Sequence, residues 1–367
     1  MMRPPQVLSL IAAGVALAGA GVWLVSRQPT DNAAEQAGGP VLALSKADLN
    51  AVTRLRIFKG DGSHTTLTRD ATHWVVLERG YPADSGQVRG LLLDLSALKV
   101  EEQKTADPGL YAKLGVEDPT GVQTGSTGLD IDLNARTLHL IVGRTSGTAG
   151  VYLRVAGQPR SVLATPQLTP DADPRHWLDR TLLDIAPERI IEVDEKPPGG
   201  PEYSIKRAPS TASGAAPDYV VTPIPKGREL ADAMAPASQA GALAGLQLDD
   251  VRKPGNLAAV AHATFLTSDG LMLEIAGTQD GVQRFIAVVA SASQPATQAQ
   301  ARDLNARLSG WQFELPGYRY DSLFRPLEQL LKPKEVPVPP GAPGKPPHSP
   351  GSAPAGLPFG PQKGDSH

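Results

Sequence analysis

The sequence predicts an α+β fold of two similar halves, each an antiparallel sheet with packed helices, after one N-terminal transmembrane helix. Three observations lead to this prediction. Short segments alternate apolar and polar residues with a period near two, which is typical of half-buried strands. A few other segments have apolar residues at helical spacing. The order of elements then starts again near residue 190, which predicts an internal duplication.

Residues 46–186 form the predicted first half, which opens with a meander of strands. These strands are Thr53–Lys59, His64–Arg69 and His73–Leu77, with Gly and Asp in the connections. Asp84 then has the position of a helix N-cap. The helix after it has apolar residues three or four positions apart, at Val88, Leu91, Leu92 and Leu95.

The remainder of the first half is predicted to be mostly strands. They are expected at Leu98–Glu102, Leu129–Leu133, Leu138–Val142, Val151–Val155 and Ser161–Ala164. Asp107-Pro108 is expected to open a short helical turn that ends at Gly115. A longer helix is expected to start at Asp173 or Pro174 and to carry Trp177, Leu178, Leu182, Leu183 and Ile185.

Residues 187–332 form the predicted second half. Strands are expected at Ile190–Asp194, Tyr203–Arg207, Asp218–Thr222, Ala263–Leu266, Leu271–Ile275 and Phe285–Val289, with a helix over Glu229–Leu246. The sequence DYVV at Asp218 matches HWVV at His73, and Gly277 and Trp311 are expected to correspond to Gly143 and Trp177. The interval between matching positions drifts from about 145 to about 134 residues, so the duplication is a loose one.

The N-terminal segment, residues 1–27, predicts where the protein is located. Val7–Val25 has no charged residue over 19 positions, close to the ~20 needed to span a bilayer. The alternative is a cleaved signal peptide, since Ala16-Leu17-Ala18 resembles a cleavage site, although such peptides have shorter apolar cores. A retained anchor with its short N-terminus inside predicts an inner-membrane protein whose remaining residues face the periplasm or extracytoplasmic side.

The segments that flank the two predicted halves are expected to be unstructured. Residues 28–45 include a small, polar stretch that reads as a linker. Residues 333–367 contain 11 Pro and 6 Gly among 35 residues, which predicts a disordered tail. The tail could be a spacer, a ligand for a partner or an inert end.

Composition narrows the possible partners. The formal net charge of −3, with scattered Lys and Arg, argues against a nucleic-acid-binding protein. The absence of cysteine excludes a lipidated N-terminal Cys and fits an exported domain without proving export.

A search for catalytic or metal-binding motifs assigns no catalytic, cofactor or metal residue. The histidines lack the spacing of a zinc hydrolase, and His73 and His176 read as half-buried structural residues. Asp130, Asp132 and Asn134 imitate a calcium loop, but later positions do not fit, so they read as the wet face of a strand.

Two other motifs are also interpreted without a catalytic or binding role. Ser96 and Lys99 have Ser-x-x-Lys spacing without the partner motifs that such a nucleophile needs. Gly143–Gly150 is glycine-rich but joins two predicted strands, so it reads as a hairpin loop rather than a phosphate cradle. No cofactor is expected.

Two segments are the first choices for contact residues, although structural roles suit them better. They are Glu78–Asp84 and Trp177–Arg180. Trp74 and Trp177 read as large apolar anchors, and Asp179 is expected to pair with Arg180 or to cap its helix.

Several stretches resemble the bacterial family DUF4340. They are HWVVLERGYPADSGQVRGLLLDLSALKVEEQKTADPGLYAKLGVEDP from His73, GVYLRVAG from Gly150, HWLDRTLLDI from His176 and WQFELPGYRYDSLFRPLEQLL from Trp311. The resemblance implies one membrane span, an exported α+β domain and association with ABC transporters of the gliding-motility kind. It implies no catalytic residue, and it offers no role for the Pro/Gly-rich tail.

The expected function is therefore that of a non-enzymatic, membrane-anchored extracytoplasmic binding or accessory protein. Its expected partners are the membrane and a transporter or other envelope protein. The alternatives are a hydrolase of an envelope polymer or lipid, using Ser96 and Lys99 or paired acids, and a small-ligand binder that uses the cleft between the halves.

Overall fold

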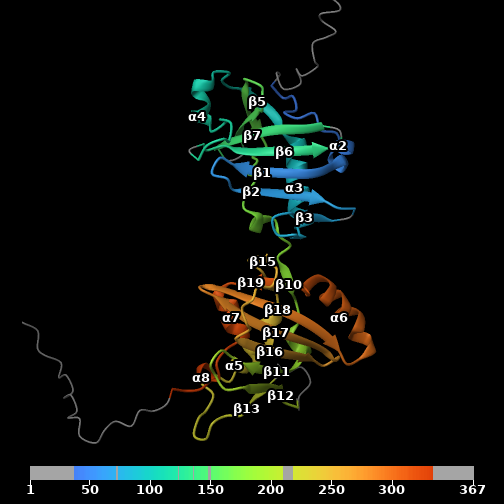
Figure 1. Ribbon diagram of the computed structural model, residues 1–367, viewed down its shortest axis with the longest axis vertical. Helices are drawn as coiled ribbons and strands as arrows, with labels where there is room; N and C mark the ends of the chain where they lie inside the picture. The colour runs from blue at the N-terminus through green and yellow to red at the C-terminus, as the bar shows by residue number, and fades with distance from the viewer. Residues whose placement is uncertain are drawn as a thin grey trace, which may run out of the picture.

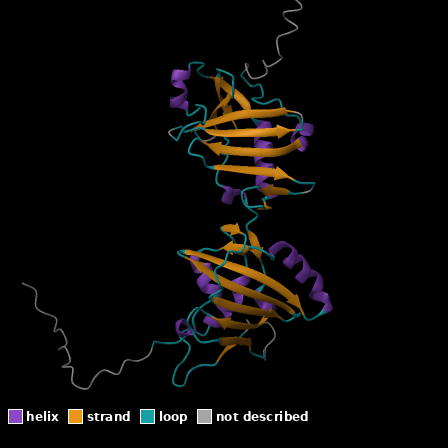
Figure 2. Cartoon of the chain, viewed as in Figure 1, coloured by secondary structure: helices purple, strands orange, loops and turns teal. Residues whose placement is uncertain are grey.

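The computed structural model describes residues 37–333, apart from 72, 123, 135, 148–149 and 210–217. These residues form an α+β protein with two large antiparallel sheets, which confirms the predicted fold class at this level. The sheets lie in two lobes that follow one another along the long axis, as Figures 1 and 2 show. The predicted anchor and the tail from residue 334 onward lie outside the described residues. Within the described ranges, no helix has the length and apolarity to cross a membrane.

The first lobe contains a nine-stranded sheet in the order β4-β3-β2-β1-β6-β7-β8-β9-β5. Its strands are β1 (Val52–Lys59), β2 (His64–Arg69), β3 (Trp74–Val76), β4 (Tyr81–Pro82), β5 (Lys99–Gln103), β6 (Thr127–Leu133), β7 (Arg136–Ser146), β8 (Gly150–Val155) and β9 (Ser161–Thr165). Its helices are α2 (Lys46–Ala51), α3 (Ser85–Ala97) and α4 (Tyr111–Leu114), with 3-10 turns η2 (Pro108–Leu110) and η3 (Pro174–Trp177).

The second lobe contains an eight-stranded sheet in the order β13-β12-β11-β16-β17-β18-β19-β15. Its strands are β11 (Ile190–Lys196), β12 (Tyr203–Arg207), β13 (Tyr219–Thr222), β15 (Asp250–Arg252), β16 (Ala261–Thr267), β17 (Leu271–Asp280), β18 (Gln283–Ala292) and β19 (Gln312–Glu314). Its helices are α5 (Ala235–Ala240), α6 (Pro295–Leu308), α7 (Gly317–Leu323) and α8 (Leu327–Leu330), with 3-10 turns η4 (Pro187–Arg189) and η5 (Gly241–Leu243). A small sheet of β10 (Thr181–Leu183) and β14 (Leu246–Gln247) lies between the two large ones in the chain.

The two sheets have the same strand order once the edge strand β4 is set aside. In each lobe the first three strands form a meander, and the chain then crosses to the opposite edge to form β5 or β15. The pairing of β1 with β6 is interrupted between Val52 and Arg54, and that of β11 with β16 between Ile190 and Glu192. Both interruptions lie at the same place in the first strand of their sheet.

The register of the paired strands shows which of the residue matches predicted between the two halves are correct. Trp74 and Tyr219 occupy equivalent positions, because Leu55, Leu67 and Val76 pair in sequence as Val193, Ile205 and Val221 do. By the same reasoning, Gly277 of the second sheet is equivalent to Val142 of the first sheet and not to Gly143. The predicted match is therefore wrong by one residue. Trp311 precedes β19 whereas Trp177 follows β9, so these tryptophans are not equivalent. The division at residue 186 stays a prediction.

Local signals account for the best-predicted helix. The side chain of Asp84 accepts hydrogen bonds from the backbone N–H groups of Gly86 and Gln87, as an N-cap does. The four apolar residues chosen by their spacing are the buried ones in α3. Gly115 ends α4 with φ 69°, a conformation that glycine adopts without strain.

Two predicted helices are wrong. The segment after Asp173 forms only the turn η3 and then the strand β10, because its backbone finds partners in other segments: the Asp84 N–H donates to Trp177 O and β10 pairs with β14. In residues 229–246 the helical part is limited to α5 and η5, since it starts only at Ala235 and ends before Gly245, whose φ of 52° does not fit a helix, and β14 begins at Leu246. Helix α6 was not expected, although Thr297, Ala301, Leu304 and Leu308 are buried at helical spacing.

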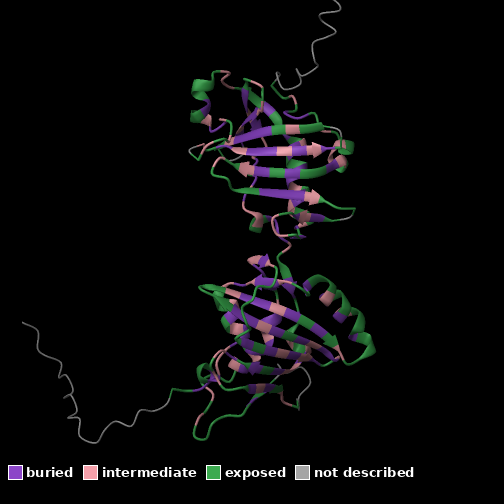
Figure 3. Cartoon of the chain, viewed as in Figure 1, coloured by how far each residue is buried: buried purple, intermediate pink, exposed green. Residues whose placement is uncertain are grey.

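Most of the buried apolar side chains form one continuous cluster that extends from the first lobe into the second, while Tyr111, Val116 and Ile141 form a small separate cluster. In Figure 3 buried positions run along the strands of both lobes. Tyr81, Trp177 and Leu178 from the first half belong to this cluster together with Leu248 and Phe313 from the second. The lobes are therefore joined by a hydrophobic contact as well as by the chain.

Candidate functional site

The two segments chosen from the sequence as contact residues lie side by side where the lobes meet. Ala83 and Leu178 form an isolated antiparallel bridge, and the Asp179 N–H donates to Pro82 O at 3.0 Å. We call this region the joint: it comprises Glu78–Asp84 and Trp177–Arg180, with Leu248–Lys253 and Trp311–Glu314 of the second lobe. The segments hold one another in place, which is a structural role.

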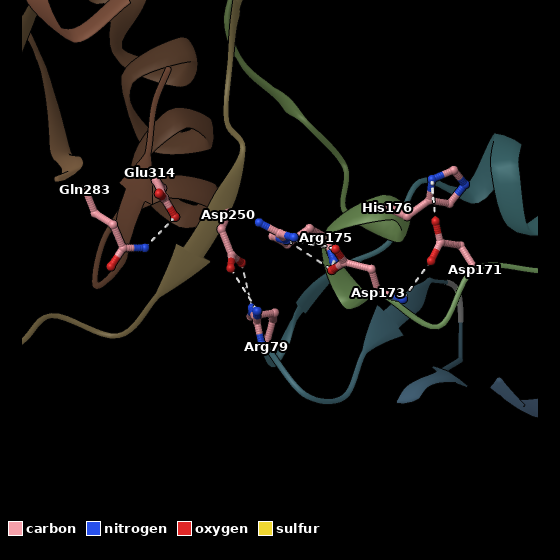
Figure 4. A network of polar contacts seen from close by, with 8 residues as sticks. All are labelled: Arg79, Asp171, Asp173, Arg175, His176, Asp250, Gln283 and Glu314. Atoms are coloured by element: carbon pink, nitrogen blue, oxygen red, sulfur yellow. Dashed lines mark hydrogen bonds and ion pairs between the residues drawn. The ribbon is translucent and has the colours of Figure 1, made fainter. Parts of the chain in front are cut away.

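Two arginines of the first lobe bind carboxylates of the second. Arg79 donates to both oxygens of Asp250, with Nε–Oδ1 and Nη2–Oδ2 distances of 2.6 and 2.8 Å, as Figure 4 shows. Arg180 donates from Nη2 to Asp249 at 2.6 Å and from Nε to Leu248 O at 2.9 Å. The hydrogen bond to Asp250 raises the pKa of Arg79. Bidentate arginine–carboxylate pairs fix orientation as well as contributing energy, so the Arg79–Asp250 contact helps to set how the lobes meet.

Aromatic side chains form the apolar part of the joint. The ring of Tyr81 lies 5.3 Å from that of Trp311 and 5.9 Å from that of Phe313, edge-on in both cases. Burial raises the pKa of Tyr81 to about 12. Edge-to-face packing of this kind is favourable for aromatic pairs.

A cavity of about 420 Å³ opens at the joint, between Glu78 and Arg79 on one side and residues of β15, β18 and β19 on the other. Most of its charged groups already have partners. Arg252 pairs with Asp280 at 2.7 Å, and Gln283 donates to Glu314 at 3.1 Å. One carboxylate oxygen of Glu78 is buried without a hydrogen-bond partner.

Further polar pairs of the first lobe lie next to the joint in Figure 4. Arg175 binds Asp173, and this hydrogen bond lowers the pKa of the Asp173 carboxyl. His176 lies 3.7 Å from Asp171. These groups therefore bind one another beside the joint.

The motifs set aside in the sequence do not meet at this site. The Ser96 hydroxyl donates to Leu93 O of its own helix, and Lys99 begins β5. Asp130 contacts His139 and Arg56, and Asp132 contacts Arg54, so the alternating acids are the wet face of β6 as predicted. Within the described residues no cluster of three metal-binding side chains occurs.

Other expectations for single residues are settled by the structure. β7 and β8 form a hairpin, as predicted, but Gly143–Ser146 belong to β7 and Gly150 begins β8, so most of the glycine-rich stretch expected as a loop is strand. Trp74 and Trp177 are buried anchors. His73 and His176, in contrast, are exposed rather than half-buried: His73 lies just before β3, and His176 lies within η3, one residue before the buried Trp177. Asp179 accepts from the Thr181 N–H and does not pair with Arg180.

Sequence reasoning missed a buried carboxyl in the second lobe. Glu195 is 2% exposed, and its Oε1 accepts a hydrogen bond from Gln239 Nε2 at 2.6 Å. Glu195 Oε2 and Gln239 Oε1 have no partner. Desolvation raises the pKa of Glu195 well above its usual value. A protonated carboxyl would supply the donor that this pair of acceptors lacks.

The Glu195→Gln variant is expected to gain stability relative to the wild type as pH increases. A carboxyl whose pKa is raised in the folded state does not lower the free energy of unfolding at pH values below its unfolded pKa of about 4.3, because it is protonated in both states. As the pH rises toward the folded pKa, the unfolded chain ionises first and the wild type loses stability. Denaturant unfolding of both proteins between about pH 4 and pH 9 measures the difference. Glu274→Gln, on the exposed face of β17, is the matched control. A constant difference between Glu195→Gln and wild type at all pH values would contradict the expectation.

The fold and the joint together define a class: a two-lobed α+β protein whose sheets share one strand order and whose polar groups at the lobe boundary bind one another. The chain belongs to the family described as a domain of unknown function, DUF4340, whose model matches residues 74–262. The match therefore runs from β3 into β16 and crosses the joint. No curated protein and no solved structure matches the chain significantly.

Proposed function

We propose that this protein is a membrane-anchored, extracytoplasmic binding protein and a non-catalytic component of an envelope complex associated with an ABC transporter. The observation that carries this proposal is the self-pairing of the polar groups at the joint. A site whose charges bind one another is suited to holding two lobes in a fixed orientation for a partner. The uncharged Val7–Val25 segment would hold this body at the inner membrane, facing the periplasm.

The two halves also fit an internal duplication, which we include in the proposal. The shared strand order, the matching interruption in the first strand and the equivalence of Trp74 and Tyr219 support it. Duplicated lobes would give a transporter partner two related surfaces on one rigid body.

Affinity purification of the tagged full chain from crosslinked native membranes tests the proposal. We expect subunits of an ABC-type transporter to copurify, and we expect external protease to digest the body in spheroplasts with an intact inner membrane. An Arg302→Gln variant, altered at an exposed position of α6, is the control and should retain the partner. Protection of the body until the membrane is lysed, or purification without any membrane partner, would refute the proposal.

A second candidate function is binding of a small ligand in the joint cavity. The cavity volume of about 420 Å³ and the unpartnered Glu78 oxygen favour it. A thermal-shift screen tests it, since a ligand bound only by the folded state raises the melting temperature. The shift should vanish in Glu78→Gln, and a screen without any stabilising compound would remove this candidate.

A further inference from the structure

A second cavity, of about 440 Å³, lies in the first lobe, away from the joint. It is bounded by α2, by α3 and by the ends of β2 and β3. Its apolar surface comes from Trp74, which is buried, together with Leu49, Leu92 and Leu93. Leu93 is 54% exposed, which is unusual for a leucine on a helix whose other leucines are buried.

The charged residues around this cavity are all cations. Lys46, Arg69 and Arg89 line it, and no Asp or Glu does. None of the three forms an ion pair in the part of the chain that the structure describes, whereas the arginines of the joint are paired. Arg69 Nη1 donates to Asn50 O at 3.1 Å, which holds its guanidinium beside α2.

Cations gathered without a counter-ion repel one another, and their repulsion is relieved by a bound anion. The apolar wall beside them, of which Leu93 is the exposed part, adds the burial of hydrocarbon as a second source of affinity. We propose that this cavity binds a single-chain anionic amphiphile, an aliphatic chain that ends in a carboxylate or a phosphate. The headgroup contacts Arg69 and Arg89, and the chain lies against Trp74 and Leu93. The inference does not depend on the membrane anchor or on a transporter partner.

Octanoate and octyl phosphate are suitable probes for the full chain held in phosphatidylcholine nanodiscs. We expect both to bind saturably, and octyl glucoside and octyltrimethylammonium to bind at least roughly tenfold more weakly. Inorganic phosphate alone should also bind more weakly, because it buries no hydrocarbon. 8-Bromooctanoate should quench the fluorescence of Trp74, and the quenching should be lost in Trp74→Phe.

The decisive variant is Arg69→Gln combined with Arg89→Gln, for which we expect roughly tenfold weaker binding of octanoate or more. Arg302→Gln on α6 is the matched control and should bind as the wild type does. Circular dichroism and the denaturation midpoint establish that each variant is folded.

Three outcomes would overturn the proposal. If the double variant bound octanoate as tightly as the wild type does, Arg69 and Arg89 would not be the headgroup site. Equal affinity for octyl glucoside would show an apolar cavity without anion selectivity. Binding only to vesicles with anionic lipids, and not to the monomeric probes, would indicate a membrane-surface contact instead.

Discussion

Replacing Tyr81 by alanine is expected to lower the free energy of unfolding by about 3–5 kcal/mol, the usual cost of removing a buried aromatic side chain. Tyr81 is 2% exposed and contacts Trp311 and Phe313 of the other lobe. The variant loses the hydrophobic contact between the lobes and leaves a cavity at the joint. Denaturant unfolding of the purified chain, followed by tryptophan fluorescence, measures the loss. We also expect the wild type to unfold in one transition and the variant to unfold in two.

Two further variants serve as controls for this result. Tyr81→Phe keeps the ring and is expected to cost less than about 1 kcal/mol, since the change conserves most of the side-chain volume. Tyr318→Ala removes a tyrosine that is 73% exposed and should leave the unfolding midpoint unchanged. If Tyr81→Ala unfolded with wild-type stability in one transition, the aromatic contact would not join the lobes.

The Arg79–Asp250 pair is expected to show a coupling energy of about 1–3 kcal/mol in a double-mutant cycle. The two side chains are only 28% and 18% exposed and form two hydrogen bonds, so removing one partner leaves a partly buried charge. The cycle uses Arg79→Ala, Asp250→Ala and the double variant, with the free energy of unfolding as the measurement.

The Lys196–Glu202 pair is the matched comparison within the second lobe. Its side chains are 61% and 68% exposed, so its cycle should show no measurable coupling. Coupling of Arg79 with Asp250 that is no larger than this would mean that the pair does not hold the lobes.

Most strands were predictable because apolar residues recur at every second position, although burial does not alternate strictly in all of them: Thr65, Thr66 and Leu67 of β2 are all buried. His64–Arg69 and Tyr203–Arg207 have the bounds expected from alternation alone. The helix after Asp84 was predictable for a similar reason, since its cap and its apolar spacing agree. The segment after Trp177 was not, because its leucines are buried in a strand whose backbone pairs with residues far along the chain.

The sites were less predictable than the fold. Glu78–Asp84 and Trp177–Arg180 were identified as contact segments, but Asp250 was not, since 171 positions separate it from Arg79. Glu195 and Gln239 lie 44 positions apart, and nothing in the local pattern indicates that they meet. Lys46, Arg69 and Arg89 come from separate elements, so only folding brings them to one cavity.

The crossing of β5 and β15 to the far edge of each sheet has a kinetic consequence. β5 can pair with β9 only when Ala164, 64 residues after Val100, has been made, and β15 can pair with β19 only when Phe313, 62 residues after Val251, has been made. Pairing over such distances delays the completion of a sheet. During synthesis each lobe therefore passes through an interval in which β5 or β15 is made but its partner strand is not.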